Sequence, residues 1–259
     1  MSDIVRKHTL KLLEQNTRSD LRKLDEYRTI TLEYGAVSGA EGSARVRIGD
    51  TDVLAGVKFE VGKPFSDTPD QGSIMVNAEL RPMSSPDFEP GPPSIKAIEM
   101  ARVIDRALRE GGAIDFKKLC IKEGESMWMV IVDIYPINDA GNLFDAASLA
   151  ALAAIKDAKF PKINSENKID YHESTNKKID MGTMPLSCTI YNIGGKILVD
   201  PTNDEEELCD ARITAGVLEN GSISSLQKGG DYGLTIDQVN EMVDVAIKKS
   251  KDLRKVMQK

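Results

Sequence analysis

The sequence is short of the residues that many enzymes use for metal binding and nucleophilic catalysis. Its 259 residues include only two histidines, His8 and His172, and three cysteines, Cys120, Cys188 and Cys209. Both histidines fall in polar stretches, and no two cysteines have the close spacing of a zinc ribbon. These absences argue against a Ser-His-Asp triad and against a metal site. We expect no metal and reduced thiols in a cytoplasmic protein.

Long apolar segments and an excess of positive charge are also missing. No stretch approaches the roughly 18 apolar residues of a membrane-spanning helix, and the first residues contain no apolar core of a secretion signal. The 34 basic and 41 acidic side chains give a net charge of −7. This balance excludes binding to nucleic acid or membrane through overall charge, but it leaves room for a small basic site.

Hydrophobic periodicity predicts a mixed α/β fold of two halves, each with strands before a helix. The elements expected in the first half are a helix over 3–15, a charge-dense connector over 17–28 with the composition of a solvated loop, an antiparallel meander over 29–82, a proline-rich loop over 82–93, a helix over 95–110, a strand over 127–136 and an alanine-rich helix over 146–158. The alanines favour a helix that packs closely on both sides.

The polar residues 161–178 predict a linker, which divides the chain into an N-terminal half (1–160), a linker region (161–184) and a C-terminal half (185–259). Gly194-Gly195 and Asn220-Gly221 each predict a β-hairpin in the C-terminal half. Thr235 and Gln238 match a capping box at the start of a closing helix. The two halves are expected to form one compact unit.

Three arginines lie on one side of the helix predicted over 95–110. At 100° per residue, Arg102, Arg106 and Arg109 fall within an arc of about 60°. Guanidinium groups in such a stripe match the phosphate oxygens of a nucleic-acid strand. Acidic neighbours such as Glu99 and Asp105 are close enough to neutralise part of the stripe. Spacing alone therefore also fits a solvated helix face with local ion pairs.

Two further segments are candidates for chemistry. The acidic run 200–207, followed by Asp210, could bind Mg²⁺ or supply an acid and a base, although such runs are usually surface turns. The loop Gly141-Asn142-Leu143 precedes the alanine-rich helix, and a helix N-terminus can bind phosphate. This loop contains no Arg or Lys.

The order and spacing of several weak motifs are specific when taken together. The motifs are Arg18–Arg22, Glu41–Thr51, Val76–Leu80, Phe88–Pro93, Ala101–Arg109 and Leu198–Thr202. In this order they resemble the RNase PH family, and most closely the non-catalytic RNase PH-like ring subunit of the archaeal exosome. The resemblance covers the chain from about residue 10 to the C-terminus.

The resemblance implies an RNase PH-like α/β (α+β) fold of two pseudo-repeated halves, each of mixed sheet plus helices. It also implies a hexameric ring of three heterodimers, in which this subunit alternates with a catalytic RNase PH-like exosome subunit under RNA-binding cap subunits. Such a ring degrades single-stranded RNA from the 3′ end and consumes inorganic phosphate.

One departure from the family pattern bears on catalysis. Active members carry a Gly-Thr-Arg-type segment whose arginine holds the attacking phosphate, whereas this chain has Gly141-Asn142-Leu143 at that place. The resemblance therefore implies no catalytic residue and no cofactor in this chain, with phosphate used by the partner subunit. It implies RNA contact by Arg102 and Arg106, with Arg109 as a third candidate.

Two other functions stay open at this point. The chain could itself be an active phosphate-dependent 3′-to-5′ exoribonuclease that uses Asp204, Asp210 or their neighbours. It could also be a soluble metabolic enzyme on the same architecture, because a fold does not determine a function.

Overall fold

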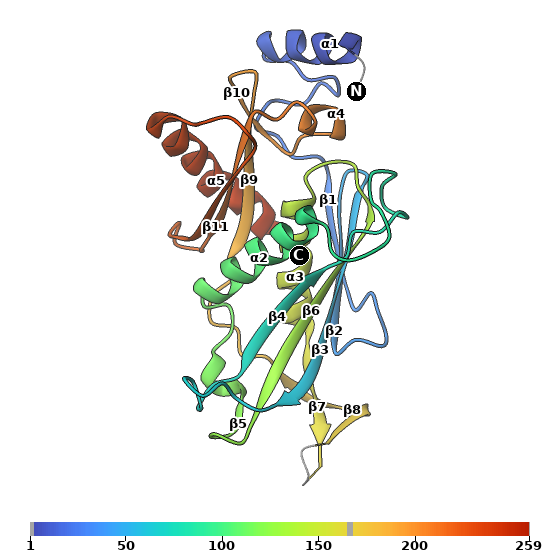
Figure 1. The fold of residues 1–259 in the computed structure, drawn as a ribbon, viewed down its shortest axis with the longest axis vertical. Coiled ribbons are helices and arrows are strands. Elements are labelled where there is room, and N and C mark those ends of the chain that lie inside the picture. Colours follow the sequence, from blue (N-terminus) through green and yellow to red (C-terminus); the bar gives the residue numbers. More distant parts are fainter. Residues whose placement is uncertain (1–2, 165–167, 259) are drawn as a thin grey trace.

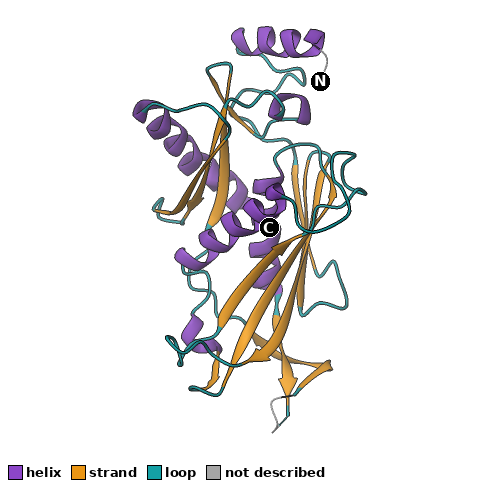
Figure 2. Ribbon diagram, viewed as in Figure 1, coloured by secondary structure: helices purple, strands orange, loops and turns teal. Residues whose placement is uncertain are grey.

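The computed structural model describes residues 3–164 and 168–258 (Figures 1 and 2). The helices are α1 (Asp3–Glu14), α2 (Ile95–Glu110), the 3-10 helix η1 (Phe116–Leu119), α3 (Leu143–Asp157), α4 (Asn203–Glu206) and α5 (Ile236–Val256). The strands are β1 (Ile30–Tyr34), β2 (Gly42–Ile48), β3 (Thr51–Gly62), β4 (Ser73–Ala78), β5 (Cys120–Lys122), β6 (Ser126–Asn138), β7 (Lys159–Ile163), β8 (Ile169–Lys178), β9 (Leu186–Ile193), β10 (Lys196–Val199), β11 (Ala211–Val217) and β12 (Ile223–Gly229).

The larger sheet has the strand order β1-β2-β3-β6-β4, with β5 paired to β6. Strands β1, β2, β3 and β6 pair antiparallel, as the alternating sequence predicts for the first three. The predicted meander is wrong for β4, which lies beyond β6 and runs parallel to it. The reason is the helix α2 between β4 and β6, because a strand–helix–strand crossover returns the chain in the same direction.

The smaller sheet has the order β10-β9-β11-β12, and all its pairs are antiparallel. Both predicted hairpins are present, and Thr235 and Gln238 form the expected capping box at the start of α5. Helix α3 lies between the two sheets (Figure 1). Every residue of α3 from Leu143 to Ile155 is buried, which explains the alanine-rich sequence. Residues of both halves share one hydrophobic cluster.

Residues 161–178, predicted as a polar linker, are not a loop in the described residues. Strands β7 and β8 form a hairpin, which projects at the lower end of the molecule in Figure 1. Its base is fixed by Phe160, whose ring lies 4.7 Å from that of Phe59 and 5.6 Å from that of Trp128. Most of the described residues of β8 are exposed, in keeping with the polar composition of that strand. Residues 165–167 of the predicted linker lie outside the described residues.

Candidate functional site

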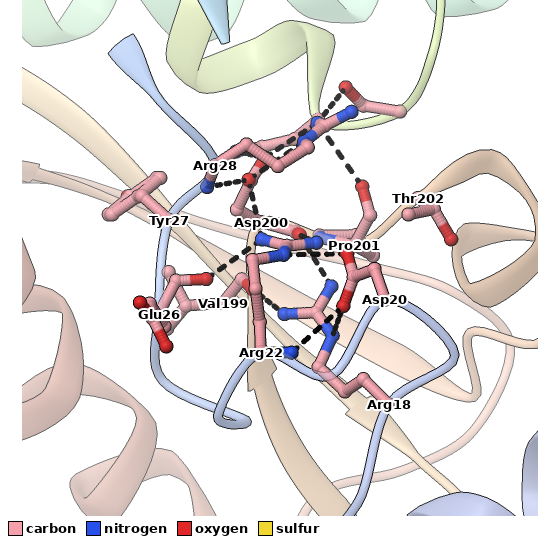
Figure 3. A network of polar contacts seen from close by, with 12 residues as sticks. Arg18, Asp20, Arg22, Glu26, Tyr27, Arg28, Val199, Asp200, Pro201 and Thr202 are labelled. Carbon is pink, nitrogen blue, oxygen red and sulfur yellow. Dashed lines mark hydrogen bonds and ion pairs between the residues drawn. The ribbon is translucent and has the colours of Figure 1, made fainter. Parts of the chain in front are cut away.

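The connector at residues 17–28 is the first place where charge is concentrated (Figure 3). Arg18 is only 1% exposed. Its guanidinium donates to both oxygens of the Glu205 carboxylate, from Nε at 2.9 Å and from Nη2 at 2.5 Å. It also donates to the carbonyl oxygens of Val199 and Asp200, at 2.9 and 2.7 Å. The connector is a loop with exposed residues, but the prediction that its charges are solvated is wrong for Arg18, because the acceptors come from a segment about 180 residues later.

Two more arginines of this connector converge on Asp200, which is fully buried and has a left-handed backbone with φ of +50°. The Asp200 carboxylate accepts from Arg22 Nη1 at 2.9 Å and from Arg28 Nη2 at 2.7 Å. It also accepts from the Arg28 backbone N–H at 2.8 Å and from Asn142 Nδ2 at 3.1 Å. Figure 3 shows the side chains of Arg22 and Arg28 converging on Asp200, with Arg18 beside them. We call Arg18, Arg22, Arg28, Asp200 and Glu205 the arginine–carboxylate cluster.

The cluster decides how the acidic run after β10 can act. Its carboxylates at positions 200 and 205 are used to hold the connector, so they are buried and paired instead of lying in a surface turn. Within residues 3–164 and 168–258, no group of three or more His, Cys, Asp or Glu is arranged to hold a metal ion.

Asp210 accepts from the Gly194 backbone N–H at 2.8 Å and so supports the β9–β10 turn. His8 is exposed, and the side chain of His172 lies outside the described residues.

The N-terminus of α3 lies beside this cluster and is surrounded by carboxylates. Asn142, its N-cap residue, has φ of +58°, and its backbone N–H donates to Glu206 Oε2 at 2.8 Å. In the first turn, Asp145 accepts from Tyr27 OH and from the Thr189 N–H, both at 2.7 Å. Burial raises the pKa of Asp145 to about 7 and also raises the pKa of Glu206. The backbone N–H of Asn142, which could otherwise bind an anion at the start of α3, is therefore already bonded to the Glu206 carboxylate.

The arginine stripe is carried by α2, which begins at Ile95 after the Ser94 cap, as predicted. Arg102 is exposed and makes no hydrogen bond or ion pair with any described residue. Arg106 is exposed as well, and its Nη2 donates to Gln227 Oε1 at 2.6 Å. Two of the three predicted side chains are thus accessible and have no carboxylate partner.

Arg109 differs from the other two members of the stripe. Its Nη2 donates to Asp105 Oδ1 at 2.9 Å and to the Ile74 carbonyl at 2.7 Å. Its Nε donates to Asp105 Oδ2 at 3.1 Å, and the guanidinium carbon lies 5.5 Å from the centre of the Phe116 ring. The structure therefore ties Arg109 to the edge of the large sheet, and Asp105 neutralises its charge.

A groove of about 800 Å³ runs beside Arg102, between β4 and the proline-rich loop before α2. Phe88 and the prolines of that loop form one wall, and Val76, Ala78 and Ala97 contribute apolar surface. The carboxylates of Glu79, Asp87, Glu89 and Asp133 also line it, against the cations Arg81 and Arg102. The groove itself is thus unfavourable for phosphate, and the accessible positive charge lies on the adjoining surface of α2.

Models of the 3′ exoribonuclease family, which is the RNase PH family, match two segments that together make up most of the chain. Domain 1 of the family matches residues 26–161 and domain 2 matches residues 183–249. The chain belongs to the RNase PH family. The family prediction and the predicted fold class are thereby confirmed.

Curated relatives of this RNase PH-family chain align along its full length. An exosome complex component Rrp42 of Methanocella arvoryzae is 45% identical over 258 residues, covering 100% of this chain and 97% of the relative. A protein of the same name from Methanothermobacter thermautotrophicus is 43% identical, covering 99% of this chain and 95% of the relative.

Solved structures agree with this family assignment. A chain from the Archaeoglobus fulgidus exosome with RNA bound to the active site is 42% identical, with a TM-score of 0.91, and covers 98% of this chain and 97% of that one. A chain of an archaeal exosome core is 38% identical with a TM-score of 0.88, covering 99% and 97%.

Sequence reasoning missed the arginine–carboxylate cluster and the acidic groove. The cluster had one sequence signal, the high density of arginines at 18, 22 and 28, but the acceptors are distant in sequence.

No described helix is apolar over a length that would cross a membrane.

Proposed function

We propose that this RNase PH-family chain is a non-catalytic subunit of an archaeal exosome ring. In this role it supports 3′-to-5′ phosphorolytic degradation of RNA by a catalytic RNase PH-like partner subunit, with which it alternates in a hexamer of three heterodimers. Full-length similarity to proteins named exosome complex component Rrp42, and to chains of archaeal exosome structures, supports the assembly.

The single observation that carries the non-catalytic role is the carboxylate at the N-terminus of α3. Phosphorolysis needs a phosphate dianion held in line by cationic or amide donors. Here the Asn142 amide is bonded to Glu206, and Arg28, which donates to the neighbouring Gly141 carbonyl, is bonded to Asp200. A phosphate placed there would face buried acidic groups, which raises its free energy strongly. The inorganic phosphate is therefore assigned to the partner's site.

The contribution to RNA binding is assigned to α2. Arg102 and Arg106 keep their full positive charge on an exposed surface, so we propose that they contact phosphates of single-stranded RNA at the boundary with the catalytic partner. Arg109 is a weaker candidate, since a phosphate must compete with Asp105 for its guanidinium. Cap subunits that bind RNA complete the proposed assembly.

The test is reconstitution with the catalytic partner. The chain alone, the partner alone and an equimolar mixture are assayed for phosphate-dependent shortening of a 5′-labelled RNA, while native mass spectrometry reports the assembly. We expect an alternating hexamer and rapid degradation only in the mixture. Robust phosphate-dependent degradation by the chain alone would overturn the proposal.

The alternative, an active site in this chain that uses Asp210, has its own test. Asp210→Asn is compared with the unmodified chain in the assembled ring. Because Asp210 caps a turn in the structure, we expect unchanged turnover. Loss of turnover in a variant that still forms the hexamer would instead support catalysis by this chain.

A further inference from the structure

Four arginines lie on α2 or against it, and they differ in the acceptor that each one meets. Arg109 is paired with Asp105 on the same helix, and Arg212 of β11 is paired with Glu99 at 2.7 Å. Arg106 meets the side-chain amide of Gln227, and Arg102 meets no described acceptor. A carboxylate cancels the charge of the arginine that it holds, whereas a neutral amide orders the guanidinium and leaves its charge intact.

We propose that Gln227 is a positioning residue for Arg106, which it holds in the orientation that receives an RNA phosphate. This inference rests on the proposed function. Gln227 belongs to β12, the edge strand of the smaller sheet, and lies 121 positions after Arg106 in the sequence. The C-terminal half of the molecule thus orients a phosphate-binding side chain of the N-terminal half.

The geometry of the amide favours this role. Gln227 Oε1 accepts from Arg106 Nη2 at 2.6 Å, and Gln227 Nε2 donates to the Lys228 carbonyl oxygen at 3.2 Å. The second bond fixes which end of the amide faces the arginine. An amide turned the other way would place two N–H donors against each other and lose both bonds.

The physical advantage is a smaller loss of conformational freedom on binding. An exposed arginine samples many rotamers, and a phosphate that captures it must restrict them all. One hydrogen bond to Gln227 restricts the side chain beforehand and uses one edge of the guanidinium. Among the described residues, the Nε and Nη1 groups of Arg106 have no acceptor, so they remain available for phosphate oxygens.

The experiment separates ordering of Arg106 from its charge. The ring is assembled with its catalytic partner and without cap subunits, in phosphate-free buffer so that RNA is not consumed. Binding of a fluorescein-labelled oligoadenylate is measured by anisotropy over a series of salt concentrations for Gln227→Ala, Gln227→Glu and Arg106→Ala. Asn220→Asp is the matched control, because it adds the same charge as Gln227→Glu to the same hairpin and keeps the acceptor for the Ser222 N–H.

Gln227→Ala is expected to weaken binding by about 3- to 10-fold with an unchanged salt slope, because one hydrogen bond is lost but the charge of Arg106 remains. Gln227→Glu and Arg106→Ala are each expected to weaken binding and to reduce the slope of log K against log[salt] by about one. The double variant Arg106→Ala/Gln227→Ala should bind as Arg106→Ala does, and Asn220→Asp should bind as the unmodified ring does.

The outcomes distinguish the inference from the function on which it rests. If Arg106→Ala weakens binding but Gln227→Ala does not, the positioning role is wrong and the RNA contact stands. If Arg106→Ala changes neither affinity nor slope, both the contact at Arg106 and the positioning role are wrong. Native mass spectrometry checks assembly of each ring, and Gln227→Met, which keeps the side-chain length without the acceptor, replaces Gln227→Ala if that variant does not assemble.

Discussion

Two groups of arginines have contrasting environments in this protein. One group is Arg18, Arg22 and Arg28, and the other is Arg102 and Arg106. Arg18 is buried against Glu205, and Arg22 and Arg28 are bonded to the buried Asp200. Arg102 and Arg106 stand on an exposed helix face without a carboxylate partner. The first group connects the N-terminal connector to the C-terminal half, whereas the second leaves positive charge at the surface of a protein with a net charge of −7.

The difference shows that an arginine's role follows from its acceptors more than from its spacing. Both groups recur every few residues, so a sequence pattern cannot separate them. The buried group has charged acceptors on α4 and after β10, and breaking such a pair leaves an uncompensated charge in a low-dielectric interior. The exposed group is solvated in the free chain, and its removal leaves no buried charge without a partner.

The largest expected effect is on folding. Arg18→Ala should lower the free energy of unfolding by about 3–5 kcal/mol, because Glu205 would remain buried without its cation. Arg102→Ala, at a solvated position, should change it by less than about 0.5 kcal/mol. Urea denaturation of both variants checks the contrast. Equal stability of the two variants would mean that the buried cluster does not stabilise the fold.

The second prediction concerns Asp145, a buried carboxyl group that is not paired with an arginine, in contrast to Asp200 and Glu205. Asp145 is buried with Tyr27, Asn142 and Thr189 as its donors, and its pKa in the folded protein is raised to about 7 from an ordinary value of 3.8. The folded chain therefore holds a proton that the unfolded chain has released, so this group's contribution to stability falls as pH rises from about 4 to about 7.

Asp145→Asn removes this titration and should flatten that part of the stability–pH curve. Thermal unfolding midpoints of the variant and the unmodified chain between pH 4 and pH 8 measure the difference. A parallel shift of the two curves, with the same slope, would contradict a raised pKa at Asp145. The comparison with the unmodified chain matters because burial raises the pKa of Glu206 in the same direction.

The third prediction concerns the exposed group. In the assembled ring, Arg102→Ala should weaken binding of single-stranded RNA and reduce the salt slope by about one, because one phosphate contact is lost. Arg109→Ala is the control on the same helix, since Asp105 already neutralises that guanidinium, and it should change the slope much less. Equal slopes for the two variants would show that the acceptors do not separate these arginines.

The smallest expected effect lies at Leu21, within the connector of the buried cluster. Leu21 has φ of +67°, and the residue is 85% exposed. The left-handed conformation costs a leucine about 1–2 kcal/mol, and glycine avoids this cost but loses about 0.4–1 kcal/mol through the unfolded chain. Leu21→Gly should therefore stabilise the fold by about 0.5–1 kcal/mol in urea denaturation. A loss of stability would mean that the exposed leucine contributes to the cluster's conformation.

The local elements of this protein follow closely from its sequence. The Ser94 cap, the boundaries of α2, the capping box of α5 and the turns at Gly194-Gly195 and Asn220-Gly221 depend on neighbouring residues, and each is found where it was predicted. The motif order also indicated the family, which the family models confirm. The prediction of RNA contact at Arg102, Arg106 and Arg109 stays a prediction, although the acceptors now rank Arg109 below the others.

Contacts between distant segments could not be predicted in the same way. Alternating apolar residues showed that β4 is a strand, but its parallel position beyond β6 depends on the crossover through α2. The density of arginine at 17–28 showed charge, but the fold alone places Asp200 and Glu205 against it, because burial makes each charge require its counterpart. The sequence by itself determined the long helices, the turns and the arginine stripe of this protein, and it indicated the family. Only the tertiary structure decided that the connector's arginines are neutralised, since Asp200 and Glu205 are brought to them from the other half of the chain, whereas Asp105 neutralises Arg109 from the same helix.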